Sequence, residues 1–221
     1  MNVCIVKHNP ALIKPWGDGN GAGAGKVCEI YRFPEAATDE SYMVRFSTAT
    51  IEVPESDFTL YPGYIRHHRT LKGLCAFNIN GLGSTTLIDQ SGTVFDFFGE
   101  SQLRCHLTTD SAFATNLIHH PKVNVKDRVL QLKTVHMNLD ELFQLPLVPQ
   151  NPLHTVLNLV YVIEGELKLG NSEEGENLQT LRQGDALIAN NKGLGSGGPI
   201  WSVSNSAAKI YHGIVAIPQQ H

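Results

Sequence analysis

The sequence predicts an all-β protein, and three observations support that prediction. Short apolar or alternating segments are separated by turn residues roughly every 8 to 12 residues, as in β-barrels and β-sandwiches. No segment longer than about ten residues keeps a clean helical period. The chain has 221 residues, of which 42% are hydrophobic and 17% charged, so it can bury a sizeable core. We therefore expect a barrel or a double-sheet sandwich.

The N-terminal part contains two expected strands and a loop. Residues 2–7 form an apolar strand that Pro10 ends, and residues 27–33 alternate well enough to form the next strand. Between them lie residues 17–25, GDGNGAGAG, whose five glycines predict a loop. A phosphate-binding loop is the functional alternative, but the run lacks the GK[ST] ending and a clear strand-to-helix context.

The stretch from 44 to 80 combines alternating strands with arginines and histidines. In its first strand, Arg45 and Ser47 share one face, while Val44 and Phe46 share the other. An arginine between apolar strand residues either extends to solvent or faces a cavity in which it pairs with an anion. The strand pattern alone leaves both interpretations open.

A short strand and a tight corner follow in the same stretch. FTLY at 58–61 is expected to be a strand, and the Pro-Gly pair after it a corner that leads into YIRHHRTLKG. Because neighbouring residues on a strand point to opposite faces, Arg66 and His68 share one face and His67 lies on the other.

The second half of the chain repeats the rhythm of the first. A proline-rich connector at 140–152 precedes a long strand pair at 154–170, with Gly165 at its turn. The repetition predicts two units, residues 1–125 and residues 126–221, packed closely together with strands exchanged between the halves.

The segment VYVIEGELKL, followed after a loop by LQTLRQGDALIA, resembles the second half of a cupin. In this pattern Gly184 supplies a turn with positive φ, and Asp185 is expected to cap the backbone amides beyond it. The pattern indicates a fold and says nothing about chemistry.

An ordered set of residues runs along nearly the whole chain. In chain order these are Trp16, a glycine-rich loop with Asn20, Glu29-Ile30, VRFSTA at 44–49, DFTLYPG at 57–63, Arg66, Phe98-Gly99-Glu100 and TNLI at 115–118. This set resembles the HutD/Ves family of bicupin proteins. The resemblance implies a bicupin fold, with two jelly-roll-like β-barrels or sandwiches in one chain and minimal helix. It also implies small-molecule binding and a link to histidine utilisation or stress response.

The chain also departs from the family pattern. Val44 stands where the family has tryptophan, and Ile65 stands where it has the aspartate before the arginine. Ala114-Thr115 replaces Asp-Phe, and His119-His120 replaces a pair of arginines. These differences favour a diverged relative that has kept the pocket and changed the ligand.

Metal binding is not expected from the histidine pattern. Cupin enzymes commonly hold a metal through an HxH motif, and none occurs among the ten histidines. Each adjacent pair, His67-His68 and His119-His120, points to both faces of a strand and cannot chelate one ion by itself. An improvised site of His68, His106 or His119 with Glu29 is the alternative, since ligands need only converge in space. We expect no metal and no cofactor.

Neither Ser47 nor Cys75 lies in a nucleophile motif, so a catalytic triad is not expected. The four cysteines are far apart and form no CxxC pair. Buried free thiols are the expected state, with disulfides as the alternative.

The arginines give the favoured hypothesis, which is a pocket for a small, carboxylate-bearing metabolite. Two guanidinium groups on separate strands of one barrel wall would bind a carboxylate bidentately. The alternative is an internal ion pair between Arg45 and Glu29, with Glu29 otherwise accepting from a ligand amine. The residues predicted to form the ligand site are Glu29, Arg45, Ser47, Tyr61, Arg66, His68 and Asn116.

Charge and hydropathy limit the partners. The formal net charge is −4 without a lysine- or arginine-rich run, which argues against nucleic acid. No apolar run approaches the roughly 20 residues of a membrane span, and no signal peptide is apparent, so we expect a cytoplasmic protein.

The favoured role is regulatory or sensing, in amino-acid catabolism. Two other classes stay open: a cupin enzyme, which would be an isomerase, lyase, hydrolase or metal-dependent oxygenase, and an interaction protein that forms a homodimer.

Overall fold

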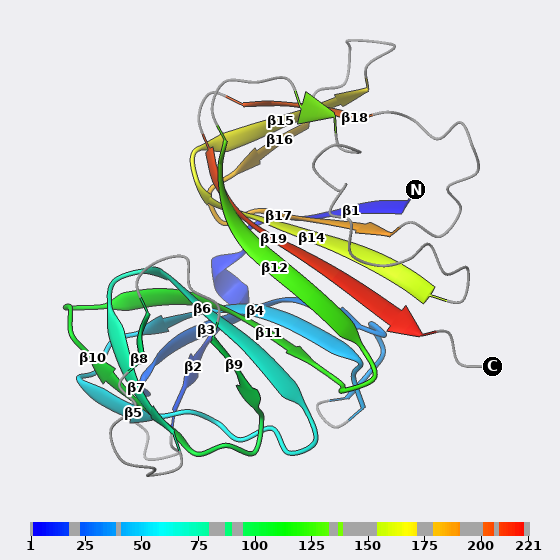
Figure 1. Cartoon of the computed structure of the whole chain (residues 1–221). Coiled ribbons are helices and arrows are strands. Elements are labelled where there is room, and N and C mark those ends of the chain that lie inside the picture. Colours follow the sequence, from blue (N-terminus) through cyan, green and yellow to red (C-terminus); the bar gives the residue numbers. More distant parts are fainter. Residues whose placement is uncertain are drawn as a thin grey trace. The chain divides into compact units, whose positions relative to one another are not determined.

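A computed structural model of the chain shows two compact units of antiparallel strands (Figure 1). One unit comprises residues 9–121, and the other comprises residues 1–8 together with 122–221. The structure describes residues 2–17, 23–38, 41–79, 87–89, 95–132, 137–138, 154–171, 179–190, 201–205 and 208–218.

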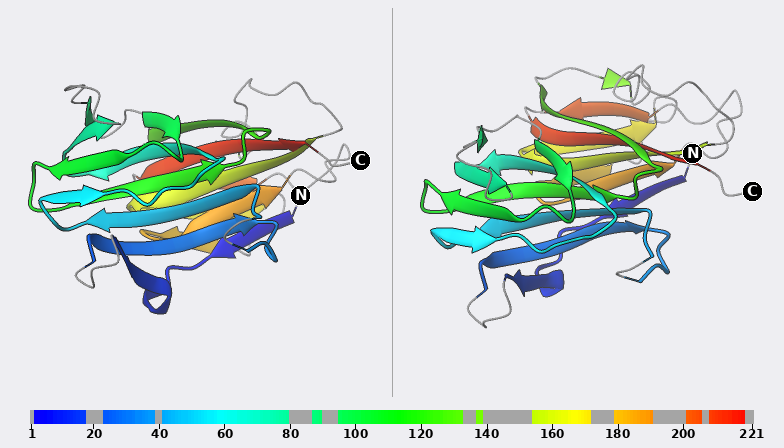
Figure 2. Two further views of the ribbon diagram at one scale, coloured as in Figure 1. Left: turned by 90° about the horizontal axis from the view of Figure 1, so that it is seen from below. Right: turned by 60° about the horizontal axis from the view of Figure 1, so that its bottom comes forward.

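The unit of residues 9–121 contains two sheets. The larger has the order β2 (Ile13–Trp16), β3 (Gly25–Phe33), β4 (Val44–Ile51), β11 (Ala112–His119), β6 (Ile65–Lys72) and β9 (Phe95–Phe98). The smaller has the order β5 (Glu55–Asp57), β10 (Leu103–Leu107), β7 (Cys75–Ile79) and β8 (Leu87–Asp89). In Figure 2 the larger sheet is the run of long blue, cyan and green arrows.

The other unit repeats this two-sheet plan. Its larger sheet has the order β1 (Asn2–Val6), β17 (Ala186–Asn190), β14 (His154–Glu164), β19 (Ala208–Pro218) and β12 (Asn124–Leu132). Its smaller sheet has the order β13 (Met137–Asn138), β18 (Trp201–Asn205), β15 (Glu166–Asn171) and β16 (Gln179–Arg182).

The predicted all-β fold with minimal helix is therefore confirmed. Within the described residues, helical structure is limited to the 3₁₀ turn η1 (Pro10–Leu12). None of the helical structure in those ranges is long and apolar enough to span a bilayer.

The first strand of the chain belongs to the unit formed by its second half. β1 pairs antiparallel with β17, and Figure 2 shows the dark-blue arrow beside the orange one. The boundary expected between residues 125 and 126 lies inside β12, whose bounds are Asn124–Leu132.

Asp185 secures this exchanged strand. Its carboxylate accepts hydrogen bonds from the backbone N–H of His8 and of Arg182, each at 2.9 Å, and from Lys7 Nζ at 2.8 Å. The expectation that Asp185 caps the amides beyond it was wrong, because the residues it binds lie before it in the chain. Gly184, with φ of 93°, supplies the turn as predicted.

The strand patterns position the core of the unit of residues 9–121. On β10, Leu103 and Cys105 are buried and Arg104 is exposed, as the alternation predicts. These side chains join an apolar cluster with aromatic residues from β7 and β9, including Phe77, Phe95 and Phe97. Phe77 and Phe95 stack with ring centroids 5.5 Å apart. The cluster fills the space between the two sheets.

All four cysteines are free. Cys75 and Cys105 are buried as expected, but Cys4 is exposed and Cys28 is half-buried, so the expectation of burial was wrong for those two. Cys28 lies on β3 near one edge of its sheet, where the strand pattern does not enforce burial.

Residues 58–61 do not form the predicted strand. The structure has β5 just before them, and Phe58, Thr59 and Leu60 run without regular pairing. Their backbone is bound in other ways: Phe58 N donates to Leu103 O at 2.9 Å, and Thr59 O accepts from an arginine side chain. Phe58 is buried, whereas Thr59 and Leu60 are both exposed, so FTLY does not keep the alternating burial of a strand.

Part of the predicted glycine loop and the whole of the proline-rich connector lie outside the described residues. The undescribed positions include Asn20 in the first and residues 140–152 in the second.

Gly99 allows a close approach of two backbone segments. A Cβ at this position would lie 2.0 Å from the carbonyl oxygen of Tyr61. Gly99 O also accepts from Tyr61 N, and Gly99 N donates to Tyr64 O, each at 2.7 Å. The absence of a side chain at residue 99 thus positions the 61–64 corner.

We expect Gly99→Ala to lower the free energy of unfolding by about 1–3 kcal/mol, because backbone must move to admit the methyl group. Urea denaturation measures this loss. Gly63→Ala is the comparison: Gly63 has φ of 81°, but a methyl group added there would meet no atom within 4 Å, so this variant tests backbone strain without a clash. A loss no larger for Gly99→Ala than for Gly63→Ala would contradict the expectation.

Candidate functional site

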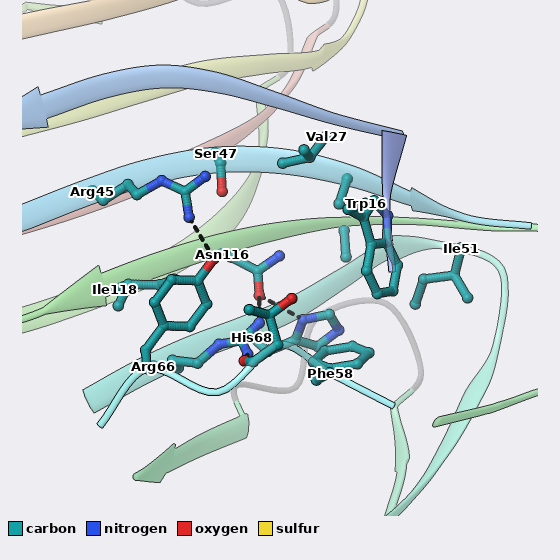
Figure 3. A pocket seen from close by; sticks show the side chains of 14 residues that line it. Trp16, Val27, Arg45, Ser47, Ile51, Phe58, Arg66, His68, Asn116 and Ile118 are labelled. Carbon is teal, nitrogen blue, oxygen red and sulfur yellow. Dashed lines mark hydrogen bonds between the residues drawn. The ribbon is translucent and has the colours of Figure 1, made fainter. Parts of the chain in front are cut away.

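A cavity of about 60 Å³ lies against the inner face of the six-stranded sheet. Its wall has a polar end and an apolar end. Figure 3 shows the two arginines at one end, and Trp16 and Ile51 at the other. Six of the seven residues predicted from the sequence line this cavity, namely Arg45, Ser47, Tyr61, Arg66, His68 and Asn116.

Strand register brings these polar residues together. β11 lies between β4 and β6, so each of its residues has a neighbour on both sides. Ile118 is opposite both Arg45 and Arg66, which places the two arginines in one row across three strands. Asn116 is in turn opposite Ser47 and His68, which gives a second row.

Arg66 is a buried cation. It is 5% exposed, and its guanidinium lies over the rings of Phe58, Tyr61 and Phe97 at 5.0 to 5.3 Å. Nη1 donates to Thr59 O at 2.9 Å and Nη2 donates to Asn116 Oδ1 at 3.0 Å. Burial lowers its pKa to about 10, so the group is still charged at neutral pH.

The charge of Arg66 has no balancing carboxylate within the described ranges. Its hydrogen-bond acceptors are a carbonyl and an amide oxygen, and its buried Nε has no partner. A buried charge without a counter-ion is costly, so this arrangement favours a site completed by an anion.

His68 is neutral and has a fixed tautomer. Its Nδ1 donates to Asn116 Oδ1 at 3.1 Å, because an amide oxygen can only accept, which leaves Nε2 to accept from Thr70 Oγ1 at 3.3 Å. Burial lowers the pKa of His68 to about 4, and the charge of Arg66 adds to this effect. The ring also packs edge-on against Phe58 and Phe77, so it forms part of the wall.

Glu29 is the predicted residue that does not line the cavity. Its carboxylate binds two arginines: Arg32 through Nε at 2.8 Å and Nη2 at 2.7 Å, and Arg45 through Nε at 2.6 Å. Burial alone would raise its pKa, but these bonds outweigh burial and hold the pKa below its ordinary value. Glu29 therefore has the ion-pair role that the sequence left open as an alternative.

Arg45 links this ion pair to the cavity. Its Nε binds Glu29 and its Nη1 donates to the hydroxyl of Tyr61 at 2.8 Å. Burial would lower the pKa of Arg45, but Tyr61 and Glu29 together raise it. Tyr61 is thus fixed at the polar end of the cavity, between the two arginines.

Sequence reasoning missed Arg32. On a regular strand, residues 29 and 32 would point to opposite faces. A register shift between Glu29 and Tyr31 changes this, and Arg32 is opposite Arg45 on β4. Strand alternation gives no indication of such an irregularity, so pairing of Glu29 with Arg32 was not predictable from it.

The improvised metal site does not form among the described residues. His68 binds Asn116, Nδ1 of His106 lies 3.3 Å from Glu55 Oε1, and His119 lies beside His67. Glu29 binds the arginines. Within the described ranges, no three or more His, Cys, Asp or Glu side chains are grouped to hold an ion.

Comparisons with known proteins agree with this fold. The HutD family model matches residues 13–198. A conserved protein of unknown function from Pseudomonas aeruginosa PAO1 is 18% identical with a TM-score of 0.72, and the alignment covers 97% of this chain and 99% of that one. HutD from Pseudomonas fluorescens SBW25, determined in a formate condition, is 21% identical with a TM-score of 0.66, covering 99% and 100% of the two chains.

A more distant neighbour is an enzyme. The formate complex of oxalate decarboxylase from Lactobacillus farciminis is 8% identical with a TM-score of 0.60, and the alignment covers 99% of this chain and 87% of that one. A search of curated proteins gives no significant match. At these identities the structural neighbours establish the two-cupin fold.

Proposed function

Because this chain belongs to the HutD family, we propose that its N-terminal cupin unit binds a small carboxylate-bearing metabolite, in a regulatory or sensing role in histidine or amino-acid catabolism. The carboxylate would bind Arg66 and the free donors of Arg45, with Tyr61 and Ser47 beside it. His68 and Asn116 would shape the wall and hold Arg66 in place.

The observation that carries this proposal is the buried guanidinium of Arg66. A desolvated charge without an internal counter-ion costs stability, and a bound anion would offset that cost. An incoming carboxylate would supply the missing counter-charge and accept from the unpaired Nε. Such charge-assisted hydrogen bonds are roughly twice as strong as neutral ones.

The apolar end of the cavity supports a ligand with a short apolar part. Trp16, Ile51 and Phe58 line that end. Trp16 is fixed there, because its Nε1 donates to Thr50 O at 2.7 Å. Formate, with three non-hydrogen atoms, would gain at most about 4.5 kcal/mol, which corresponds to a Kd of roughly 0.5 mM at best. A longer monocarboxylate that reaches the apolar end should bind more tightly.

An enzymatic role has less support from these side chains. A general acid or base should have a pKa near the working pH and reach the substrate. Glu29 lies outside the cavity wall and is ion-paired, and the pKa of His68 is about 4. The binding role needs neither group to exchange a proton.

Thermal unfolding tests the proposal directly. Formate, acetate and longer monocarboxylates should raise the melting temperature, because a ligand that binds only the native state stabilises it. At a hundredfold excess over Kd the expected rise is roughly 5–10 °C. The matched primary amides have almost the same shape without the charge, and they should give little or no rise.

Equal rises for carboxylates and amides would contradict an anion site. If no carboxylate raises the melting temperature, the proposal is also contradicted. The alternative of an interaction protein that forms a homodimer is then favoured. A metal ion in the cavity could hold the carboxylate instead of the arginines. Metal analysis of tag-free protein shows whether an ion is bound. Substitution of the cavity arginines shows whether the rise in melting temperature depends on them.

A further inference from the structure

Two histidines face each other outside the cavity. His67 on β6 and His119 on β11 lie on the face opposite to Arg66 and Asn116, because side chains alternate along a strand. The register makes them diagonal neighbours on adjacent strands. Their Nε2 atoms are 3.0 Å apart, and their ring centroids are 5.0 Å apart.

The other nitrogen of each ring lies close to an oxygen. Nδ1 of His67 lies 2.8 Å from Asp96 Oδ1, and Nδ1 of His119 donates to the carbonyl oxygen of His120 at 2.9 Å. Histidines that bind metal ions almost always donate their second N–H to a carboxylate or a carbonyl, which fixes the ring and raises its basicity. His119 has that support, whereas Nδ1 of His67 lies beside the Asp96 carboxylate without a hydrogen bond to it.

The Nε2 atoms of the two rings lie close enough to share one partner. Nδ1 of His119 carries the hydrogen, so its Nε2 presents a lone pair toward His67 at 3.0 Å. A hydrogen on Nε2 of His67 can meet this lone pair, and so can a cation bound by both rings.

We propose that His67 and His119 bind one divalent transition-metal ion of the class that prefers imidazole, such as Zn²⁺, Ni²⁺ or Cu²⁺. Zn–N bonds of about 2.0–2.1 Å fit two nitrogens close to this separation, so the rings would move little. Water would complete the coordination, since the described residues supply only these two ligands at the site. Solvent can enter beside Asp96, whose side chain is 52% exposed.

The ion would link two strands of the sheet that carries the anion site. β6 and β11 present His67 and His119 on one face, and Arg66 and Asn116 on the other. Metal binding would therefore stabilise the sheet on which the cavity is built. It requires no contact with the cavity ligand, so this proposal stands or fails independently of the proposed function.

Isothermal titration of tag-free protein with Zn²⁺ or Ni²⁺ at neutral pH tests the site. The wild type should bind one ion, and His67→Ala and His119→Ala should weaken binding at least tenfold. Because His119 is buried and its variant is at risk of misfolding, Asp96→Asn provides a second test. Loss of the carboxylate beside His67 should weaken binding roughly 10- to 100-fold.

His106→Ala is the matched control, because it removes a half-exposed histidine that lies beside Glu55 instead. This variant should bind the ion as the wild type does. Absence of stoichiometric binding by the wild type would overturn the proposal and leave the pair as a hydrogen bond. Equal binding by the wild type and by His67→Ala and Asp96→Asn would overturn it as well.

Discussion

Arg66→Met is expected to abolish the rise in melting temperature that a carboxylate gives to the wild type. Removing one partner from a buried charge pair costs about 2–5 kcal/mol, which corresponds to a loss of affinity of roughly 30-fold or more. Methionine keeps much of the apolar stem in contact with Phe58 and Phe97. The substitution therefore removes the charge while largely preserving the packing.

The ligand-free stability of this variant separates binding from folding. Arg66→Met loses the hydrogen bonds to Thr59 O and Asn116, but it also removes a desolvated charge, so the two effects largely offset. Arg104→Met is the control, because Arg104 is 55% exposed and pairs with Glu55. A carboxylate should raise the melting temperature of Arg104→Met as much as that of the wild type. Equal shifts in Arg66→Met and the wild type would remove Arg66 from the site.

Glu29→Gln is expected to destabilise the protein at neutral pH and to flatten its acid sensitivity. The substitution leaves Arg32 and Arg45 as half-buried neighbours without their shared carboxylate. Because the Glu29 side chain is 34% exposed, the loss should lie between the values for surface and buried pairs, at about 1–2 kcal/mol. Urea unfolding measures it.

The pH dependence follows from the direction of the pKa shift. The folded-state pKa of Glu29 lies below the ordinary value of 4.5, so the unfolded chain takes up a proton first on acidification. The stabilisation is fully present above the unfolded pKa and is lost as pH falls through the folded pKa. The difference between wild type and variant should therefore be constant near neutrality and shrink in acid.

Glu55→Gln is the matched control for this experiment. Glu55 pairs with Arg104, but both side chains are more than half exposed, so the pair contributes little. A loss of stability as large as that of Glu29→Gln would contradict the predicted role of burial. The predicted role would also be contradicted if the difference in unfolding free energy between Glu29→Gln and the wild type persisted below the folded-state pKa of Glu29.

The sequence predicted much of the cavity wall because strand alternation is a local property. Arg45 and Ser47 on one strand, and Arg66 and His68 on another, lie on the faces that their spacing predicted. The family resemblance added Asn116, whose position on β11 lies between those strands. It also led to Phe98-Gly99-Glu100, where Gly99 proves to permit the close approach to Tyr61.

The histidine pairs show the limit of that local reasoning. Alternation correctly separates His67 from His68, because His68 lines the cavity and His67 contacts His119 on the other face. Alternation cannot show that His67 of the first pair contacts His119 of the second across β6 and β11. Strand pairing and register are set by contacts distant in sequence. The expectation of no metal rested on the missing HxH motif and on each pair taken alone.

The sequence by itself determined the all-β class, the family and the face on which each strand residue lies, since these depend on residue type and a period of two. Tertiary structure alone decided which polar groups became partners. A register shift in β3 turned Arg32 toward Glu29, and the insertion of β11 between β4 and β6 placed Arg45 and Arg66 in one row. The two arginines nevertheless differ in their partners. Arg45 has a carboxylate partner, whereas Arg66 lines the cavity and its Nε is unpaired.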